Sequence, residues 1–184
     1  MMFQLDVAPG LTLRQFTLPD AEAVFAAADR DREYLRVWLP WVDQTHSAED
    51  SRRFIRGAQA QFEAALGPNC GIWSAGALAG SVGCHTIDWS NRKCSIGYWV
   101  SADMQGRGIV TRSVAAMLDY LFEDLQLHRV LIECGTENLK SCAVPQRLGF
   151  QREGVARQAE WVGGRWVDLV QWAMLRWEWA ARKK

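Results

Sequence analysis

The chain has 184 residues, the size of one domain with a substantial core, and 49% of them are hydrophobic. Its 21 basic and 21 acidic residues cancel to a formal net charge of zero, so no charge excess draws it toward nucleic acid or an anionic membrane. No apolar run approaches the roughly 20 residues that span a bilayer, and the amino end lacks the features of a signal peptide. We therefore expect a globular, cytoplasmic protein without a membrane or nucleic-acid partner.

Hydrophobic periodicity and turn residues predict alternating strands and helices. In chain order, the predicted elements are a strand at 11–16, helices at 19–35 and 48–66, strands at 71–74, 78–87 and 95–100, a helix at 110–125, a strand at 128–134, a helix at 141–148, and strands at 150–161 and 166–175. Gly163 and Gly164 predict a tight hairpin between the last two strands. The strand, helix and strand between residues 95 and 134 should form a right-handed parallel crossover.

Cysteine and tryptophan are the two informative residue types. The five cysteines are odd in number and form no Cys-x-x-Cys pair, which predicts reduced thiols and no metal site. Ten tryptophans exceed what one small core normally absorbs, so we expect a homodimer. Four tryptophans lie in polar or turn contexts and are candidates for lining a pocket or an interface: Trp38, Trp41, Trp161 and Trp166.

A glycine-bearing loop, Gln105–Val110, joins the strand that ends at Val100 to the helix that follows. At such a junction, unpaired backbone N–H groups at the positive end of the helix dipole form an anion site suited to a pyrophosphate. The spacing matches Gln/Arg-x-x-Gly-x-Gly/Ala, the acetyl-coenzyme A (acetyl-CoA) loop of the GNAT N-acetyltransferases. An ordinary glycine-rich turn is the alternative interpretation of these six residues alone.

Further segments extend this resemblance over nearly the whole chain. The chain resembles the GNAT superfamily, and more closely the Rim-type ribosomal-protein N-terminal acetyltransferases, in Ile96–Trp99, Gly106–Ile109, Asn138–Ser141, Pro145–Phe150 and Gln158–Trp161. The resemblance implies an α/β (α+β) fold in one acetyltransferase domain, residues 1–184. It implies a central mixed, twisted sheet of about seven strands with helices on both faces. It also implies a splayed pair of parallel strands that holds acetyl-CoA.

The resemblance places this cofactor between the strands that end at Val100 and Cys134. A β-bulge near Trp99 or Val100 would free backbone groups to pair with the pantetheine arm, and a backbone N–H would stabilise the thioester oxyanion. The pyrophosphate would rest on the amides of residues 107–111. Val110 departs from the family pattern, which has Gly or Ala there. The expected cofactor residues are Trp99, Val100, Gln105, Gly106, Arg107, Gly108, Ile109, Val110, Thr111 and Asn138.

Two residues are the catalytic candidates. In the wider superfamily a tyrosine four residues before the glycine at 149 often protonates the coenzyme thiolate, but here that position is Pro145. Ser141 resembles the serine that Rim-type enzymes use instead, although it and Asn138 also suit local capping. Glu160 is the candidate general base, directly or through a water, or else a solvated strand charge. Asp168 could be the base, or orient the acceptor amine or a loop.

The sequence therefore predicts acetyl transfer from acetyl-CoA to a protein N-terminal amine, such as that of a ribosomal protein, by direct attack in a ternary complex. The expected acceptor-binding residues are Trp38, Trp41, Trp161, Trp166 and Asp168. A small amine (polyamine, aminoglycoside or peptide antibiotic) is the alternative acceptor, and an acetyl-CoA-binding module without turnover is the alternative function. An acyl-enzyme on Cys134 or Cys142 is disfavoured, because neither has an orienting His or Asp at a recognisable spacing.

Overall fold

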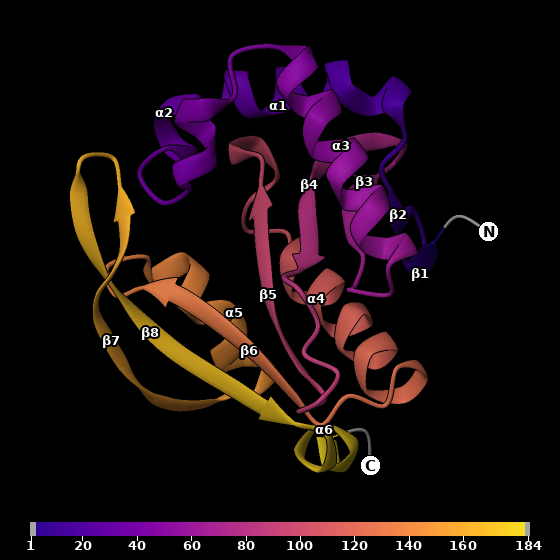
Figure 1. The fold of residues 1–184 in the computed structure, drawn as a ribbon, viewed down its shortest axis with the longest axis vertical. Helices are drawn as coiled ribbons and strands as arrows, with labels where there is room; N and C mark the ends of the chain where they lie inside the picture. The colour runs from indigo at the N-terminus through magenta and orange to yellow at the C-terminus, as the bar shows by residue number, and fades with distance from the viewer. Residues whose placement is uncertain (1–2, 183–184) are drawn as a thin grey trace.

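The computed structural model describes residues 3–182 and builds them around one eight-stranded sheet (Figure 1). The strand order is β1-β2-β3-β4-β5-β6-β8-β7, and among the described strands only β5 and β6 pair in parallel. The strands are β1 (Gln4–Ala8), β2 (Leu11–Gln15), β3 (Asn69–Ser74), β4 (Ala77–Cys84), β5 (Lys93–Val100), β6 (Arg129–Gly135), β7 (Gln151–Val162) and β8 (Arg165–Leu175). The parallel pair lies at the middle of the sheet.

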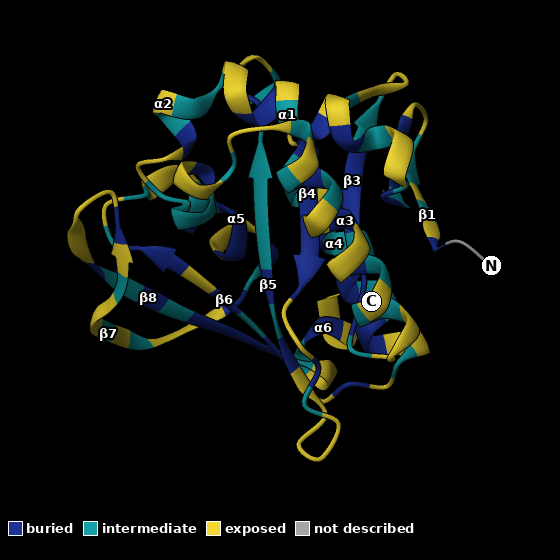
Figure 2. Cartoon of the chain, turned by 45° about the horizontal axis from the view of Figure 1, so that its top comes forward, coloured by how far each residue is buried: buried dark blue, intermediate teal, exposed yellow. Residues whose placement is uncertain are grey.

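Helices cover both faces of this sheet. The helices are α1 (Ala21–Arg30), α2 (Arg32–Leu35), α3 (Ala48–Glu63), α4 (Ile109–Asp119), α5 (Leu139–Leu148) and α6 (Arg176–Arg182). α1 and α3 pack on each other and against β4 and β3, whereas α4 and α5 pack on each other and against β5 and β6. Figure 2 shows the resulting core as buried residues along β3 and β4, with exposed residues on the outer turns of the helices. No helix within residues 3–182 is long and apolar enough to cross a membrane.

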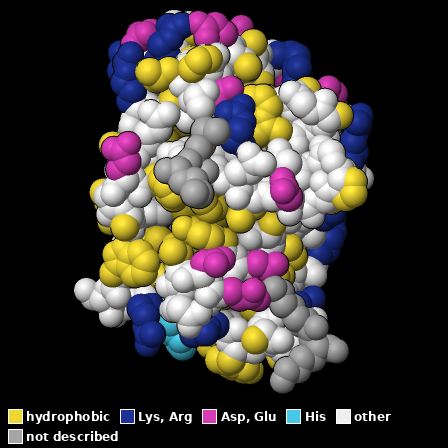
Figure 3. All heavy atoms as spheres, turned by 90° about the vertical axis from the view of Figure 1, so that its right-hand side faces the viewer, with side chains coloured by type: hydrophobic (Ala, Val, Ile, Leu, Met, Phe, Trp, Pro, Cys, Tyr) yellow, Lys and Arg dark blue, Asp and Glu magenta, His cyan; other side chains and the backbone are white. Residues whose placement is uncertain are grey.

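The predicted mixed sheet of about seven strands with helices on both faces is confirmed, and the described residues add one strand, β1, that the predicted elements did not include. The missing strand, β1, has five residues and lies at the sheet edge, where none of its side chains is fully buried. Its residues do alternate, with Gln4 and Asp6 exposed and with Leu5 and Val7 packed against the core, so the sequence carried a short strand signal that was missed. On the face that carries β1, acidic and basic side chains are interspersed with apolar ones (Figure 3).

The two central strands separate soon after they begin. The described β5–β6 ladder pairs Lys93–Ser95 with Arg129–Leu131, and beyond this point the strands diverge (Figure 1). On its other side, β5 follows β4 in one register from Ile96 to Val100. The predicted β-bulge near Trp99 or Val100 is therefore wrong. Divergence alone frees the edge of β5 that faces β6, so an extra residue is not needed.

Gly80 holds β4 against β5 beside this free edge. A Cβ atom at residue 80 would overlap the Trp99 carbonyl oxygen and lie 2.8 Å from Val100 Cα. Both obstacles are backbone atoms, which cannot move aside as a flexible side chain can. Only glycine therefore lets the two strands keep this register.

We predict that Gly80→Ala lowers the free energy of unfolding by about 2 kcal/mol, the usual cost of overpacking. Gly154→Ala is the matched control, because that strand glycine has open space where its Cβ would lie. Urea denaturation measures both variants. Equal stability of the two variants would contradict the close-approach argument.

Candidate active site

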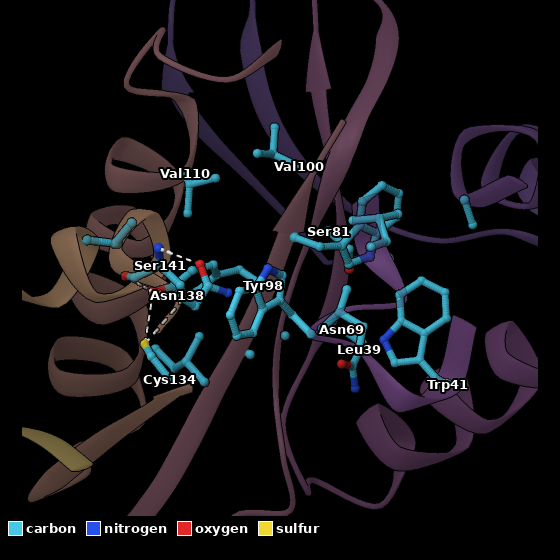
Figure 4. A pocket seen from close by; sticks show the side chains of 18 of the residues that line it. Leu39, Trp41, Asn69, Ser81, Tyr98, Val100, Val110, Cys134, Asn138 and Ser141 are labelled. Atoms are coloured by element: carbon cyan, nitrogen blue, oxygen red, sulfur yellow. Dashed lines mark hydrogen bonds between the residues drawn. The ribbon is translucent and has the colours of Figure 1, made fainter. Parts of the chain in front are cut away.

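A cavity of about 1370 Å³ lies at the divergence of β5 and β6. Its walls come from the glycine loop, β5, the end of β6, the first turns of α5, β7, and the segment from residue 34 to residue 45. Figure 4 shows Tyr98 of β5 at the centre of this cavity. Ser141, Asn138 and Cys134 lie on one side of it, and Trp41 and Leu39 lie on the other. The cavity therefore has two sides that meet at β5.

The glycine loop ends at the start of α4. Gly106 (φ 72°) and Gly108 (φ 68°) both have left-handed backbone, and Gly108 is the N-cap of the helix. A Cβ at either position would meet no atom within 4 Å, so backbone conformation, not crowding, requires glycine there. The first-turn amides of α4 have no acceptor within the helix. Together with the helix dipole, they form an anion site at the cavity wall.

Nine of the ten predicted cofactor residues line the cavity, including Val110, the departure from the family pattern. The exception within the described chain is Arg107, whose guanidinium donates to the Asp103 carbonyl oxygen at 2.9 Å. Three basic residues that the sequence analysis did not assign to the site, Arg112, Lys140 and Arg147, also line the cavity. The Lys140 Nζ donates to Gln105 Oε1 at 2.8 Å, which joins α5 to the glycine loop. Lys140 lies inside the Asn138–Ser141 motif, which could have identified it.

Both main-chain polar groups of Ser141 are hydrogen-bonded to side chains. Its N–H donates to Asn138 Oδ1 at 3.1 Å, so Asn138 caps α5 and also lines the cavity. Its carbonyl oxygen accepts the Tyr98 hydroxyl at 3.0 Å. In a regular helix this carbonyl would accept the N–H of residue 145, but Pro145 has none. Tyr98 thus supplies the hydrogen bond that Pro145 cannot make.

The Ser141 hydroxyl points into a cluster of protonated groups. Its Oγ lies 3.2 Å from Cys134 Sγ and 3.3 Å from the Tyr98 hydroxyl oxygen (Figure 4). Burial raises the pKa of the Cys134 thiol to about 12 and that of Tyr98 well above its usual value. Both groups are therefore neutral at pH 7, and Cys134 is a poor nucleophile. The buried Cys142 thiol donates to the Gly135 carbonyl oxygen at 3.6 Å.

Glu160 faces the other side of the cavity. It shares the wall with Glu133 and His85, neither of which the sequence analysis assigned to the site. The pKa of Glu160 is raised by burial and by the charge of Glu133, and His85 opposes this shift. The His85 Nδ1 lies 2.7 Å from Ser95 Oγ. A half-buried carboxylate with a raised pKa is suited to accept a proton near neutral pH.

Aromatic rings form much of the wall near Glu160. Of the five predicted acceptor-binding residues, two line the cavity and three do not. Trp38 and Trp41 line the cavity, and the Trp41 ring lies 6.0 Å from that of Trp99. Trp161 and Trp166 instead contact each other at 5.1 Å on the β7–β8 hairpin, where more than half of each side chain is exposed. Asp168 is not among the lining residues of the described chain, and its carboxylate accepts a backbone N–H. Residues 3–182 contain no cluster of His, Cys, Asp and Glu that could hold a metal.

We predict that Tyr98→Phe lowers the free energy of unfolding by about 1–2 kcal/mol, because the Ser141 carbonyl then has no donor. In a Pro145→Ala background the new N–H of residue 145 can take its place, so the same change should cost less than half as much. Urea denaturation of the four proteins measures this difference. Tyr120→Phe, a partly buried tyrosine outside the cavity wall, is the control and should cost the same in both backgrounds. A Tyr98→Phe cost that is equal in both backgrounds would contradict the assignment.

Comparison with known proteins agrees with this geometry. The acetyltransferase (GNAT) domain family matches residues 10–151. The YdaF protein of Bacillus subtilis (strain 168) is 35% identical, over 99% of this chain and 100% of that protein. The solved structure of RimL, the ribosomal L7/L12 alpha-N-protein acetyltransferase, in complex with coenzyme A, has a TM-score of 0.91 and 25% identity, and the match covers 94% of this chain and 98% of that one. The microcin C7 self-immunity acetyltransferase MccE, in complex with acetyl-CoA and AMP, has a TM-score of 0.87 and 28% identity, with 92% and 94% covered.

The family match covers most of the chain, and the same chain places a glycine-capped helix start beside a divergent parallel strand pair. This protein therefore belongs to the GNAT acetyltransferase family and is an acetyl-CoA-dependent N-acetyltransferase.

Proposed function

We propose that this enzyme acetylates the N-terminal α-amine of a protein, and that a ribosomal protein is the acceptor. One observation carries the proposal: a single cavity connects the phosphate-binding loop with Ser141 and, across β5, with Glu160 and the aromatic wall. Donor and acceptor can therefore meet in one ternary complex. The similarity to RimL, whose name specifies a ribosomal protein and an alpha-N position, supports this acceptor class.

The residues present fit acetyl-CoA along the first side of the cavity. The first-turn amides of α4 bind the pyrophosphate, with Arg112 and Lys140 adding positive charge. The free edge of β5, from Ile96 to Val100, offers main-chain groups to the pantetheine amides, as a sheet edge does to an added strand. When bound, acetyl-CoA supplies the activated thioester. Ser141 lies where it can hydrogen-bond the thiolate that leaves.

Three groups carry the chemistry. Glu160 accepts the proton of the attacking amine, whose pKa is near 8, and its own raised pKa brings the two groups closer in basicity. The Ser141 hydroxyl donates its one hydrogen to the leaving sulfur. Tyr98 keeps Ser141 in place through its carbonyl. The raised pKa of Cys134 disfavours an acyl-enzyme, which supports direct attack.

The aromatic wall favours a peptide over a polyamine as acceptor. Trp38, Trp41 and Trp99 provide flat apolar surface for the residues that follow an N-terminal amine. A peptide antibiotic is the alternative small acceptor, and the similarity to MccE supports keeping it in the test. The homodimer stays a prediction, and the exposed Trp161, Trp166 and Trp177 are the side chains that favour it. The cytoplasmic location likewise stays a prediction.

We predict that mass spectrometry will detect one added acetyl group on peptides that copy ribosomal-protein N-termini. The same peptides with a blocked α-amine and a free lysine side chain are the matched control and should gain none. Spermidine, an aminoglycoside and a peptide antibiotic are tested in parallel. Acetylation of these small amines alone would contradict the proposed acceptor, and acetylation of the lysine control would contradict the α-amine.

We predict that Glu133→Gln lowers the pKa of Glu160. Loss of the neighbouring negative charge makes the ionised Glu160 less unfavourable, so its pKa falls back toward 4.5. The base is then ionised at lower pH, and activity on the acid side should persist to lower pH. NMR titration of the Glu160 carboxyl carbon measures the shift directly. Glu63→Gln, an exposed residue at the end of α3, is the control, and a Glu160 pKa equal in all three proteins would contradict the pairing.

A further inference from the structure

The β7–β8 ladder changes register just before Glu160. Ala156 pairs with Leu169, but the next pair in the ladder is Glu160 with Val167. Three residues of β7, 157–159, therefore lie opposite a single residue of β8, Asp168. This is a bulge of two extra residues on the strand that carries the proposed base.

The bulge determines where Glu160 lies along the sheet. If the register of Ala156 and Leu169 continued, Glu160 would stand opposite Arg165, at the tip of the hairpin. The Gly163-Gly164 turn (φ 55° and 80°) instead pairs Val162 with Arg165, which places Glu160 opposite Val167. At about 3.4 Å per residue, this shift moves Glu160 about 7 Å along β8, away from the tip and toward the cavity.

Asp168 stabilises the bulge from the opposite strand. Its Oδ1 accepts the N–H of Gln158 at 2.8 Å. Gln158 has φ 50°, a left-handed conformation that is costly for a residue with a side chain and needs support from its surroundings. The Asp168 carbonyl oxygen also accepts the N–H of Thr136 at 2.9 Å, which ties this point of β8 to the end of β6. Asp168 thus links the bulge to the strand that borders the cavity.

We propose that Asp168 is a positioning residue: its carboxylate holds the β7 bulge in the register that turns Glu160 into the cavity, and it contacts neither acceptor nor donor. This inference rests on the proposed function, since it gives Glu160 the role of base. The positioning role requires an oxygen at residue 168 that accepts a hydrogen bond, and it does not require the negative charge of that residue. A direct base would require the charge.

Three variants separate these roles. Asp168→Asn keeps an oxygen that can accept the Gln158 N–H, and its kcat should stay within about threefold of wild type. Asp168→Ala removes the hydrogen-bond acceptor of the Gln158 N–H, and kcat should fall by about 10²-fold, as for Glu160→Gln. The double variant Asp168→Ala/Glu160→Gln should be no slower than Glu160→Gln alone. Asp88→Ala is the matched control, because Asp88 also accepts a backbone N–H but lies in the turn before β5.

Two further measurements make the outcome decisive. Acetyl-CoA affinity by calorimetry should be unchanged in the three variants, which also shows that each is folded. The Gln158 and Glu160 amide signals in ¹⁵N NMR spectra should move in Asp168→Ala and stay near their wild-type positions in Asp168→Asn.

Three results would overturn the inference. They are a wild-type kcat in Asp168→Ala, equal losses of kcat in Asp168→Asn and Asp168→Ala, and a double variant whose kcat is lower than that of Glu160→Gln alone. A wild-type kcat in Glu160→Gln would instead contradict the proposed base. The amide signals would then still report whether Asp168 holds the bulge.

Discussion

The divergence of β5 from β6 is the constraint on which the rest of the site depends. A parallel pair that stops after three residues leaves the main-chain groups of β5 without strand partners on that side, in the middle of a sheet where such groups are normally paired. Those groups need a ligand or water. The same divergence brings the start of α4, the start of α5 and the bulged part of β7 around one cavity. Cofactor binding, leaving-group stabilisation and proton removal are therefore consequences of one feature of the sheet.

Local departures from regular structure position each side chain at this point. Left-handed glycines open the start of α4, and a proline in α5 frees the Ser141 carbonyl for Tyr98. A bulge in β7 carries Glu160 toward the cavity. The proline and the bulge would each be unfavourable alone, and each is compensated by a specific partner, Tyr98 and Asp168. The functional groups are thus placed by irregular backbone on a regular scaffold, a common arrangement in active sites.

Much of this could be predicted from the sequence, because the information was local. The glycine loop, the Asn138 cap and the Gly163-Gly164 hairpin each depend on residues close together in the chain. The contacts that connect distant segments could not be predicted. Tyr98 and Ser141 are 43 residues apart, and Glu133 and Glu160 lie on different strands. In the sequence, Pro145 was notable only because it replaces the tyrosine that often protonates the thiolate. Its effect on the Ser141 carbonyl depends on the hydrogen bond from Tyr98, which the structure shows.

A crystal structure of the acetyl-CoA complex is the most direct test of the central claim. The account predicts pantetheine amides hydrogen-bonded to the main chain of β5 between Ile96 and Val100, with the pyrophosphate on the first-turn amides of α4 and the sulfur beside Ser141. A cofactor bound elsewhere, or one that leaves this edge of β5 unpaired, would contradict it.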